Sequence, residues 1–111
     1  MFDLDNITEE AATCNDLEEV VMGLIINSGQ ARSLAYTALK KAKEGDLAAA
    51  HQLMAQSREA LNAAHLVQTQ LIEDDQGEGK IPVTLVLVHA QDHLMTSMLA
   101  RELISELIEL H

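Results

Sequence analysis

The densest group of reactive side chains in this sequence is the segment His89-Ala90-Gln91-Asp92-His93. His89 and His93 are four residues apart, so on a helix their imidazole rings lie on the same side. They would stand at the edge of an apolar helix face, where a side chain is both held in place and accessible. Such a pair has three interpretations: a metal site, packing without chemistry, or phosphoryl transfer.

A zinc site is one interpretation, because two imidazoles at this spacing can bind one metal ion. The segment also fits the H-x-x-E-H pattern of the inverted zinc proteases, with Asp in place of Glu. Such enzymes need a further ligand and a substrate cleft, however, and a 12.1 kDa helical chain leaves little room for them. The second interpretation is a pair of partly buried side chains with only a packing role.

Phosphoryl transfer is the third interpretation. A neutral imidazole nitrogen is a nucleophile near neutral pH, because the pKa of histidine is about 6.5. A phosphorylated imidazole is also a good donor, which suits a carrier. The chain has no G-x-x-x-x-G-K-[ST] loop for a nucleotide, and a carrier that is served by other proteins would not need one.

The composition disfavours several classes of protein. Eighteen acidic against seven basic residues give a net charge of −11, and Phe2 and Tyr36 are the only aromatic residues. We therefore expect no binding to nucleic acid. The single Cys14 cannot form an internal disulfide. Without a signal peptide pattern or an apolar stretch of about 18 residues, we expect a cytoplasmic protein that does not insert into a membrane.

The spacing of small and apolar residues predicts three long helices. The first spans 16–44, with such residues at 17, 21, 24, 28, 31, 35, 38 and 42. Gly45 and Asp46 favour a helix stop and an N-cap, so a second helix over 47–73 runs antiparallel to the first. Residues 74–80 form an exposed loop, and a third helix begins at Pro82 and continues to His111.

The predicted fold is therefore all-α: an antiparallel three-helix bundle over residues 16–111, with a flexible acidic tail over residues 1–15. The third helix differs from the other two because it has two apolar faces, whereas a bundle helix needs one. The face centred on Asp92 holds Leu85, Val88, Met95, Leu99, Leu103, Leu107 and Leu110. The opposite face holds Val83, Val86, Leu87, Ala90, Leu94, Met98, Ile104 and Ile108.

One of these two faces can pack within the chain, and self-association in closed symmetry is the commonest cover for the other. The alternative is a helix that lies deep in the bundle. Asp92 would be costly if it were buried without a partner. It is protonated, paired with a cation, joined to symmetry-related copies by a metal ion, or exposed to water in a cleft, and the sequence pattern leaves these possibilities open.

Four segments resemble the lactose/cellobiose-type enzyme IIA family of the bacterial sugar phosphotransferase system. They are Glu18 to Ser33, the pairs Ala64-His65 and Gln68-Thr69, and His89 to Met95. The resemblance covers residues 17–111 and is greatest to the chitobiose/cellobiose-specific members, while residues 1–15 show none. The segment from His89 to Met95 is highly specific for the family.

The resemblance implies a homotrimer that accepts a phosphoryl group from the phosphocarrier HPr on His89. The group would pass to the cognate IIB protein, for uptake of a disaccharide such as N,N′-diacetylchitobiose or cellobiose. Gln91 and His93 would orient or shield the phosphoryl group. The role of His65, structural or functional, stays open.

The resemblance also implies that Asp92 binds a divalent metal ion at the trimer axis. Mg²⁺ is favoured there, because all the ligands would be oxygens. Two alternatives remain for the chain as a whole. One is a structural or adaptor bundle without phosphoryl transfer, and the other is a small zinc enzyme.

Overall fold

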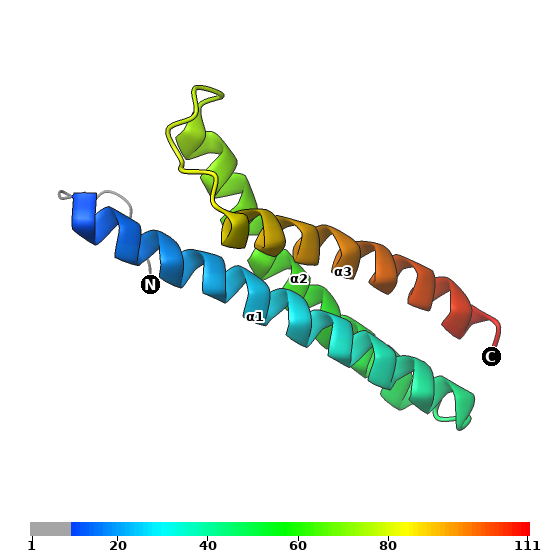
Figure 1. Cartoon of the computed structure of the whole chain (residues 1–111). Coiled ribbons are helices and arrows are strands. Elements are labelled where there is room, and N and C mark those ends of the chain that lie inside the picture. The colour runs from blue at the N-terminus through cyan, green and yellow to red at the C-terminus, as the bar shows by residue number, and fades with distance from the viewer. Residues whose placement is uncertain (1–9) are drawn as a thin grey trace.

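Three helices make up most of the part of the chain that the structure, a computed structural model, describes: residues 10–111 (Figure 1). They are α1 (Glu10–Lys43), α2 (Leu47–Asp75) and α3 (Leu85–Glu109). α1 and α3 run in the same direction and α2 runs in the opposite one, which gives an elongated bundle of 54 × 23 × 19 Å. The predicted all-α, three-helix bundle is confirmed.

The start of α1 differs from the prediction. The helix begins at Glu10, so residues 10–15 are helical rather than part of a flexible tail. This stretch contains no glycine or proline, and Ala11 and Ala12 favour helix. The rest of the predicted tail, residues 1–9, lies outside the described residues.

The ends of α3 also differ from the prediction. α3 begins at Leu85 rather than at Pro82, because Thr84 is its N-cap: the Thr84 hydroxyl accepts a hydrogen bond from the Leu87 N–H at 3.2 Å. The helix ends at Glu109, two residues before the end of the chain. The predicted turn before α2 is confirmed, since Gly45 has a φ of 87° and the Asp46 carboxylate accepts from the Ala49 N–H.

Each helix buries the row of residues that its spacing predicted. All eight row positions of α1 are buried. On α2 the same spacing predicts a row at Ala50, Met54, Ser57, Leu61, Ala64, Gln68 and Leu71, and all of these are buried except Gln68, which is half-buried. Four alanines on α1 between residues 31 and 42 are fully or almost fully buried, and such small side chains let neighbouring helices approach closely. α1 packs against both other helices, whereas α2 and α3 contact each other much less. α1 is therefore the central helix of the bundle.

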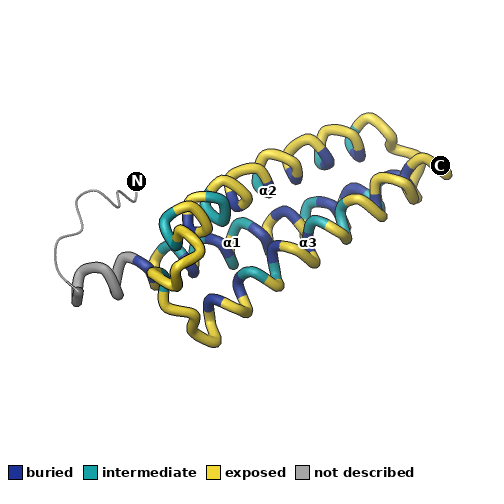
Figure 2. The backbone as a smooth tube through the Cα atoms, turned by 90° about the horizontal axis from the view of Figure 1, so that it is seen from above, coloured by how far each residue is buried: buried dark blue, intermediate teal, exposed yellow. Residues whose placement is uncertain are grey.

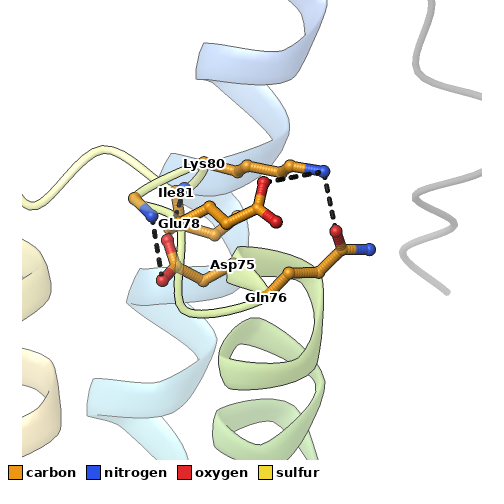
Figure 3. A network of polar contacts seen from close by, with 6 residues as sticks. Asp75, Gln76, Glu78, Lys80 and Ile81 are labelled. Carbon is orange, nitrogen blue, oxygen red and sulfur yellow. Dashed lines mark hydrogen bonds and ion pairs between the residues drawn. The ribbon is translucent and has the colours of Figure 1, made fainter.

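Side chains of the connection between α2 and α3 hold its path (Figure 3). The Asp75 carboxylate accepts a hydrogen bond from the Ile81 N–H at 2.9 Å. Lys80 donates to the side-chain oxygen of Gln76 at 2.7 Å and forms an ion pair with Glu78 at 3.8 Å. The predicted loop is thus an ordered connection that places the start of α3 relative to the end of α2.

A buried hydrogen bond joins α1 to α2. The Ser57 hydroxyl donates to the Ala31 carbonyl oxygen at 2.7 Å, and both residues are fully buried. The hydroxyls of Ser28 and Ser97 are also buried but have no partner among residues 10–111. Buried polar groups contribute to stability only when they are paired, so Ser57 stabilises the contact between α1 and α2 and Ser97 does not.

We expect Ser57→Ala to lower the free energy of unfolding by about 1 kcal/mol, because it removes a buried hydrogen bond. The matched control is Ser97→Ala, which removes an unpaired hydroxyl and should leave stability unchanged or raise it. Urea denaturation at one fixed protein concentration measures both, since self-association would make stability depend on concentration. Equal losses in the two variants would contradict the role of the Ser57 bond.

Candidate functional site: the histidine pair of α3

His89 and His93 lie next to each other on α3, as their spacing predicts. Their rings are parallel to within 2°, and the ring centroids are 6.0 Å apart. His89 is exposed, whereas His93 is half-buried. The ring of His89 is therefore accessible to another molecule, and the ring of His93 lies beside it, closer to the bundle.

His93 packs against α1 at a glycine. A Cβ atom on Gly29 would lie 3.3 Å from Nε2 of His93, which is closer than ordinary van der Waals contact. Glycine in a helix interior costs about 1 kcal/mol relative to alanine, and here it makes room for the imidazole ring. None of the predicted roles involves Gly29, although an isolated glycine within a helical pattern is a known signal of close packing.

The surroundings of His93 favour its neutral form. Burial lowers the pKa of His93, and the positive charges of Arg32 on α1 and of His89 lower it further. The charge of Asp92 acts in the opposite direction but is the smallest of these influences. A neutral imidazole has one N–H donor and one free nitrogen acceptor. His93 can therefore donate a hydrogen bond to a group held on His89, or accept one from it.

Gln91 does not lie beside His89 within one chain. Residues two apart in sequence are about 160° apart around a helix. The Gln91 side chain faces α2, where its oxygen accepts a hydrogen bond from the Gln68 side-chain amide. The same amide also lies 3.8 Å from the sulfur of Met95. The predicted role of Gln91 near His89 therefore requires a second chain, and helix periodicity alone could have shown this.

The second apolar face of α3 is exposed in the single chain (Figure 2). Asp92 is exposed at its centre, and the exposed fractions of its apolar side chains run from 44% for Leu107 to 88% for Leu85. The opposite face is packed in the bundle, with the exception of Val83, which precedes the helix, and Val86. The two-faced pattern is thus confirmed. Seven exposed apolar side chains thus share one face of α3, and an exposed apolar patch of this kind is typical of an interaction surface.

The side chains that the structure describes form no metal-binding cluster: within residues 17–111, no three His, Cys, Asp or Glu side chains come together to hold an ion. A zinc enzyme would need a third protein ligand beside the histidine pair. Asp92 supplies one carboxylate, so an all-oxygen site at this residue needs symmetry-related copies.

His65 lies away from the histidine pair. It is exposed on α2 and lines a groove between α2 and α3, together with Arg58 and Arg101. His65 and His89 therefore belong to different surfaces of the bundle.

None of the helices in the described part of the chain is long and apolar enough to cross a membrane.

We expect Gly29→Ala to displace the ring of His93 by a few tenths of an ångström, because the new methyl group would meet Nε2. Gly23→Ala is the matched control, since nothing lies within 4 Å of its new methyl group. Both changes raise the helix propensity of α1 by about 1 kcal/mol. NMR spectra of the histidine rings measure the displacement. Unchanged His93 signals in Gly29→Ala would show that the glycine does not position the ring.

Comparison of the sequence with known proteins points to one family. The profile described as "PTS system, Lactose/Cellobiose specific IIA subunit" matches residues 19–111. The N,N′-diacetylchitobiose-specific EIIA component of Escherichia coli strain K12 is 76% identical over 111 residues, which are 100% of this chain and 96% of that protein. This match includes residues 1–15, for which the sequence motifs predicted no resemblance. The lichenan-specific IIA component of Bacillus subtilis is 38% identical over 86% of this chain and 87% of that protein.

Solved structures share the fold as well as the sequence. The IIA chain in the solution structure of the Escherichia coli IIA(Chitobiose)–HPr complex is 81% identical, with a TM-score of 0.76 over 86% of this chain and 92% of that one. The cellobiose-specific enzyme IIA of Bacillus anthracis is 40% identical, with a TM-score of 0.81 over 96% of this chain and 92% of that one. The chain belongs to the lactose/cellobiose-specific IIA family of the sugar phosphotransferase system, and it is a phosphoryl carrier of that system.

Proposed function

We propose that the chain is the cytoplasmic IIA component for N,N′-diacetylchitobiose or a closely related disaccharide such as cellobiose. It accepts a phosphoryl group from HPr on His89 and passes it to its cognate IIB protein. The observation that carries this proposal is the exposed His89 ring beside a half-buried His93, in a chain 76% identical over its whole length to a chitobiose-specific EIIA component.

The chemistry follows from the two rings. A lone pair on a ring nitrogen of His89 attacks the phosphorus of the HPr phosphohistidine in line with the bond that breaks. The new N–P bond forms on His89, and the donor imidazole keeps the electron pair of the old one. In the second step a nucleophile of IIB, by family expectation a cysteine thiolate, displaces His89 in the same way. His93 holds the phosphoryl oxygens by a hydrogen bond and keeps water from one side.

The surface around His89 suits a transient protein partner. Gly29 is level with His93, and α1 runs parallel to α3, so the α1 residues beside His89 lie one to two turns before Gly29. Ile26 and Met22 are there, 62% and 49% exposed. Apolar side chains around an accessible ring form a docking surface that needs only a modest area. The HPr complex of the Escherichia coli relative supports HPr as the partner.

A homotrimer around the exposed face of α3 completes the proposed site. Three copies that meet at this face would bury the row of apolar side chains. His89 lies on one flank of the exposed apolar face of α3, and Gln91 and Met95 lie on the other. In a closed ring of three chains, the His89 flank of one chain meets the Gln91 flank of the next. Gln91 then reaches the phosphoryl group on a neighbouring chain, although it cannot do so within its own.

Asp92 lies at the centre of the same face, so three copies would converge on the trimer axis. Two unit charges about 4 Å apart repel by on the order of 4 kcal/mol at an effective dielectric near 20. A divalent cation, with Mg²⁺ favoured for a hydrated all-oxygen site, would offset this repulsion. The metal holds the assembly together and takes no part in the transfer.

We expect His89→Gln to retain the fold and to lose phosphoryl acceptance, because it removes the nucleophile. His93→Gln should accept the group more slowly, since an amide replaces the neighbouring imidazole. Intact mass after incubation with phosphoenolpyruvate, enzyme I and HPr measures both: phosphohistidine adds about 80 Da and is lost in acid but stable in base. A matched control is His51→Gln, an exposed histidine on α2.

The same measurement separates the alternatives. An adaptor bundle would show no gain in mass in the wild type under these conditions. A zinc enzyme would bind one metal ion per chain at the two histidines and show metal-dependent hydrolysis. An acid-labile phosphoryl group on His89→Gln would place the carrier residue elsewhere.

We expect Asp92→Leu to give a trimer that is about 1–4 kcal/mol more stable, because apolar replacement of a buried charged cluster often stabilises. Phosphorylation of His89 should be largely retained. Thermal unfolding and sedimentation with and without a chelator measure the effect, with Glu73→Leu, an exposed acid on α2, as control. A monomeric Asp92→Leu protein, or a wild type that responds neither to chelator nor to acid, would show that the carboxylates do not meet.

A further inference from the structure

The groove between α2 and α3 holds two arginines that have no carboxylate partner among residues 17–111. A cavity of about 320 Å³ is lined by both arginines and by Leu61, Met98 and His65, and an adjoining cavity of about 480 Å³ continues along Arg58 and Arg101. In the described part of the chain both ion pairs are made by lysines, and neither arginine has a carboxylate oxygen within 4.0 Å. This is unusual for a chain with a net charge of −11.

Arg101 is held with its charge directed into this groove. It stands seven residues after Leu94 and three before Ile104, both buried, so it occupies a core-facing position of α3. One guanidinium nitrogen donates to the Met54 carbonyl oxygen at 3.0 Å. Its Nε is buried and has no partner among residues 17–111, and a buried donor without a partner is costly. The part of the guanidinium group that lines the groove is available to donate to a bound anion.

Arg58 brings a second positive charge to the same place. Burial lowers the pKa of Arg101, and the charge of Arg58 lowers it further, which means that the two guanidinium groups repel each other. An anion between them would offset this repulsion. Two planar guanidinium groups suit the tetrahedral oxygens of a phosphate better than a halide.

We propose that the groove between Arg58 and Arg101 binds a phosphate monoester or free phosphate. The side chains of Asn62 and His65 provide further polar groups at the rim, and Leu61 and Met98 provide an apolar wall for the rest of an ester. The carboxylates of Glu102, in this cavity, and of Glu59 and Glu109, in the adjoining one, limit the affinity for an anion.

This site is separate from the histidine pair. Arg101 and His89 are about 120° apart around α3 and twelve residues apart along it, on the α2 and α1 sides respectively. Binding in the groove therefore does not depend on the proposed phosphoryl transfer. A chain without phosphocarrier activity could still bind phosphate in the groove. A chain with phosphocarrier activity could equally fail to bind phosphate there.

The test is NMR titration of the full-length protein at constant ionic strength with inorganic phosphate, glucose 6-phosphate, sulfate or chloride. We expect the Nε–H signal of Arg101 to shift with both phosphate ligands. Arg58→Gln and Arg101→Gln should weaken binding at least about tenfold, the effect of losing a charged hydrogen bond. Lys43→Gln is the control, since it removes an exposed positive charge outside both the groove and the histidine pair, and it should bind as the wild type does.

Tighter binding of glucose 6-phosphate than of phosphate would identify an ester as the ligand, and equal binding would identify the phosphate group alone. The absence of a shift, or an equal response to phosphate, sulfate and chloride, would mean an adventitious ion only and overturn the proposal. A shift that appears on raising protein concentration without ligand would mean that a second copy fills the groove, which also overturns it. Arg58 is exposed, so its variant tests the proposal even if Arg101→Gln fails to fold.

Discussion

The close packing of α1 against both other helices governs the arrangement of the whole bundle. Its buried row is made largely of alanine and serine, so α2 and α3 each approach it closely. α2 and α3 consequently meet each other at few points, and a groove remains between them. The same close approach lets His93 lie against the backbone of α1 at Gly29. Both the histidine site and the arginine groove thus follow from the small residues of one helix.

α3 has a different environment on each of its sides. One side is buried against the bundle, the second holds the histidine pair beside α1, and the third faces α2 through Gln91 and Arg101. The fourth is the exposed apolar row around Asp92. Such an exposed apolar row is unfavourable in a monomer, because exposed apolar area of this extent favours association. In the proposed trimer, the residues on either side of that row come together from different chains.

In the proposed carrier, the exposure of His89 and the lowered pKa of His93 serve different purposes. An accessible ring can meet the nucleophile or donor of a partner protein, whereas a half-buried ring cannot. A neutral ring with a lowered pKa keeps both a donor and an acceptor for the oxygens of a transferred group. Catalysis by such a pair rests on positioning more than on acid–base chemistry. Gly29, which comes from another helix, provides part of that positioning, and the charge of Arg32 on the same helix lowers the pKa of His93.

Residue patterns alone predict the helices, their buried rows, the second apolar face of α3 and the shared side of His89 and His93. These features depend on periodicity and on single residues such as Gly45 and Asp46, which act locally. Periodicity did not locate the start of α3, which follows Thr84 rather than Pro82. Three arrangements could be seen only in the folded chain: α1 lies against His93, Gln91 faces Gln68, and Arg58 and Arg101 line one groove. They join residues 23 to 64 positions apart, and their geometry depends on how the helices cross, which no local pattern encodes.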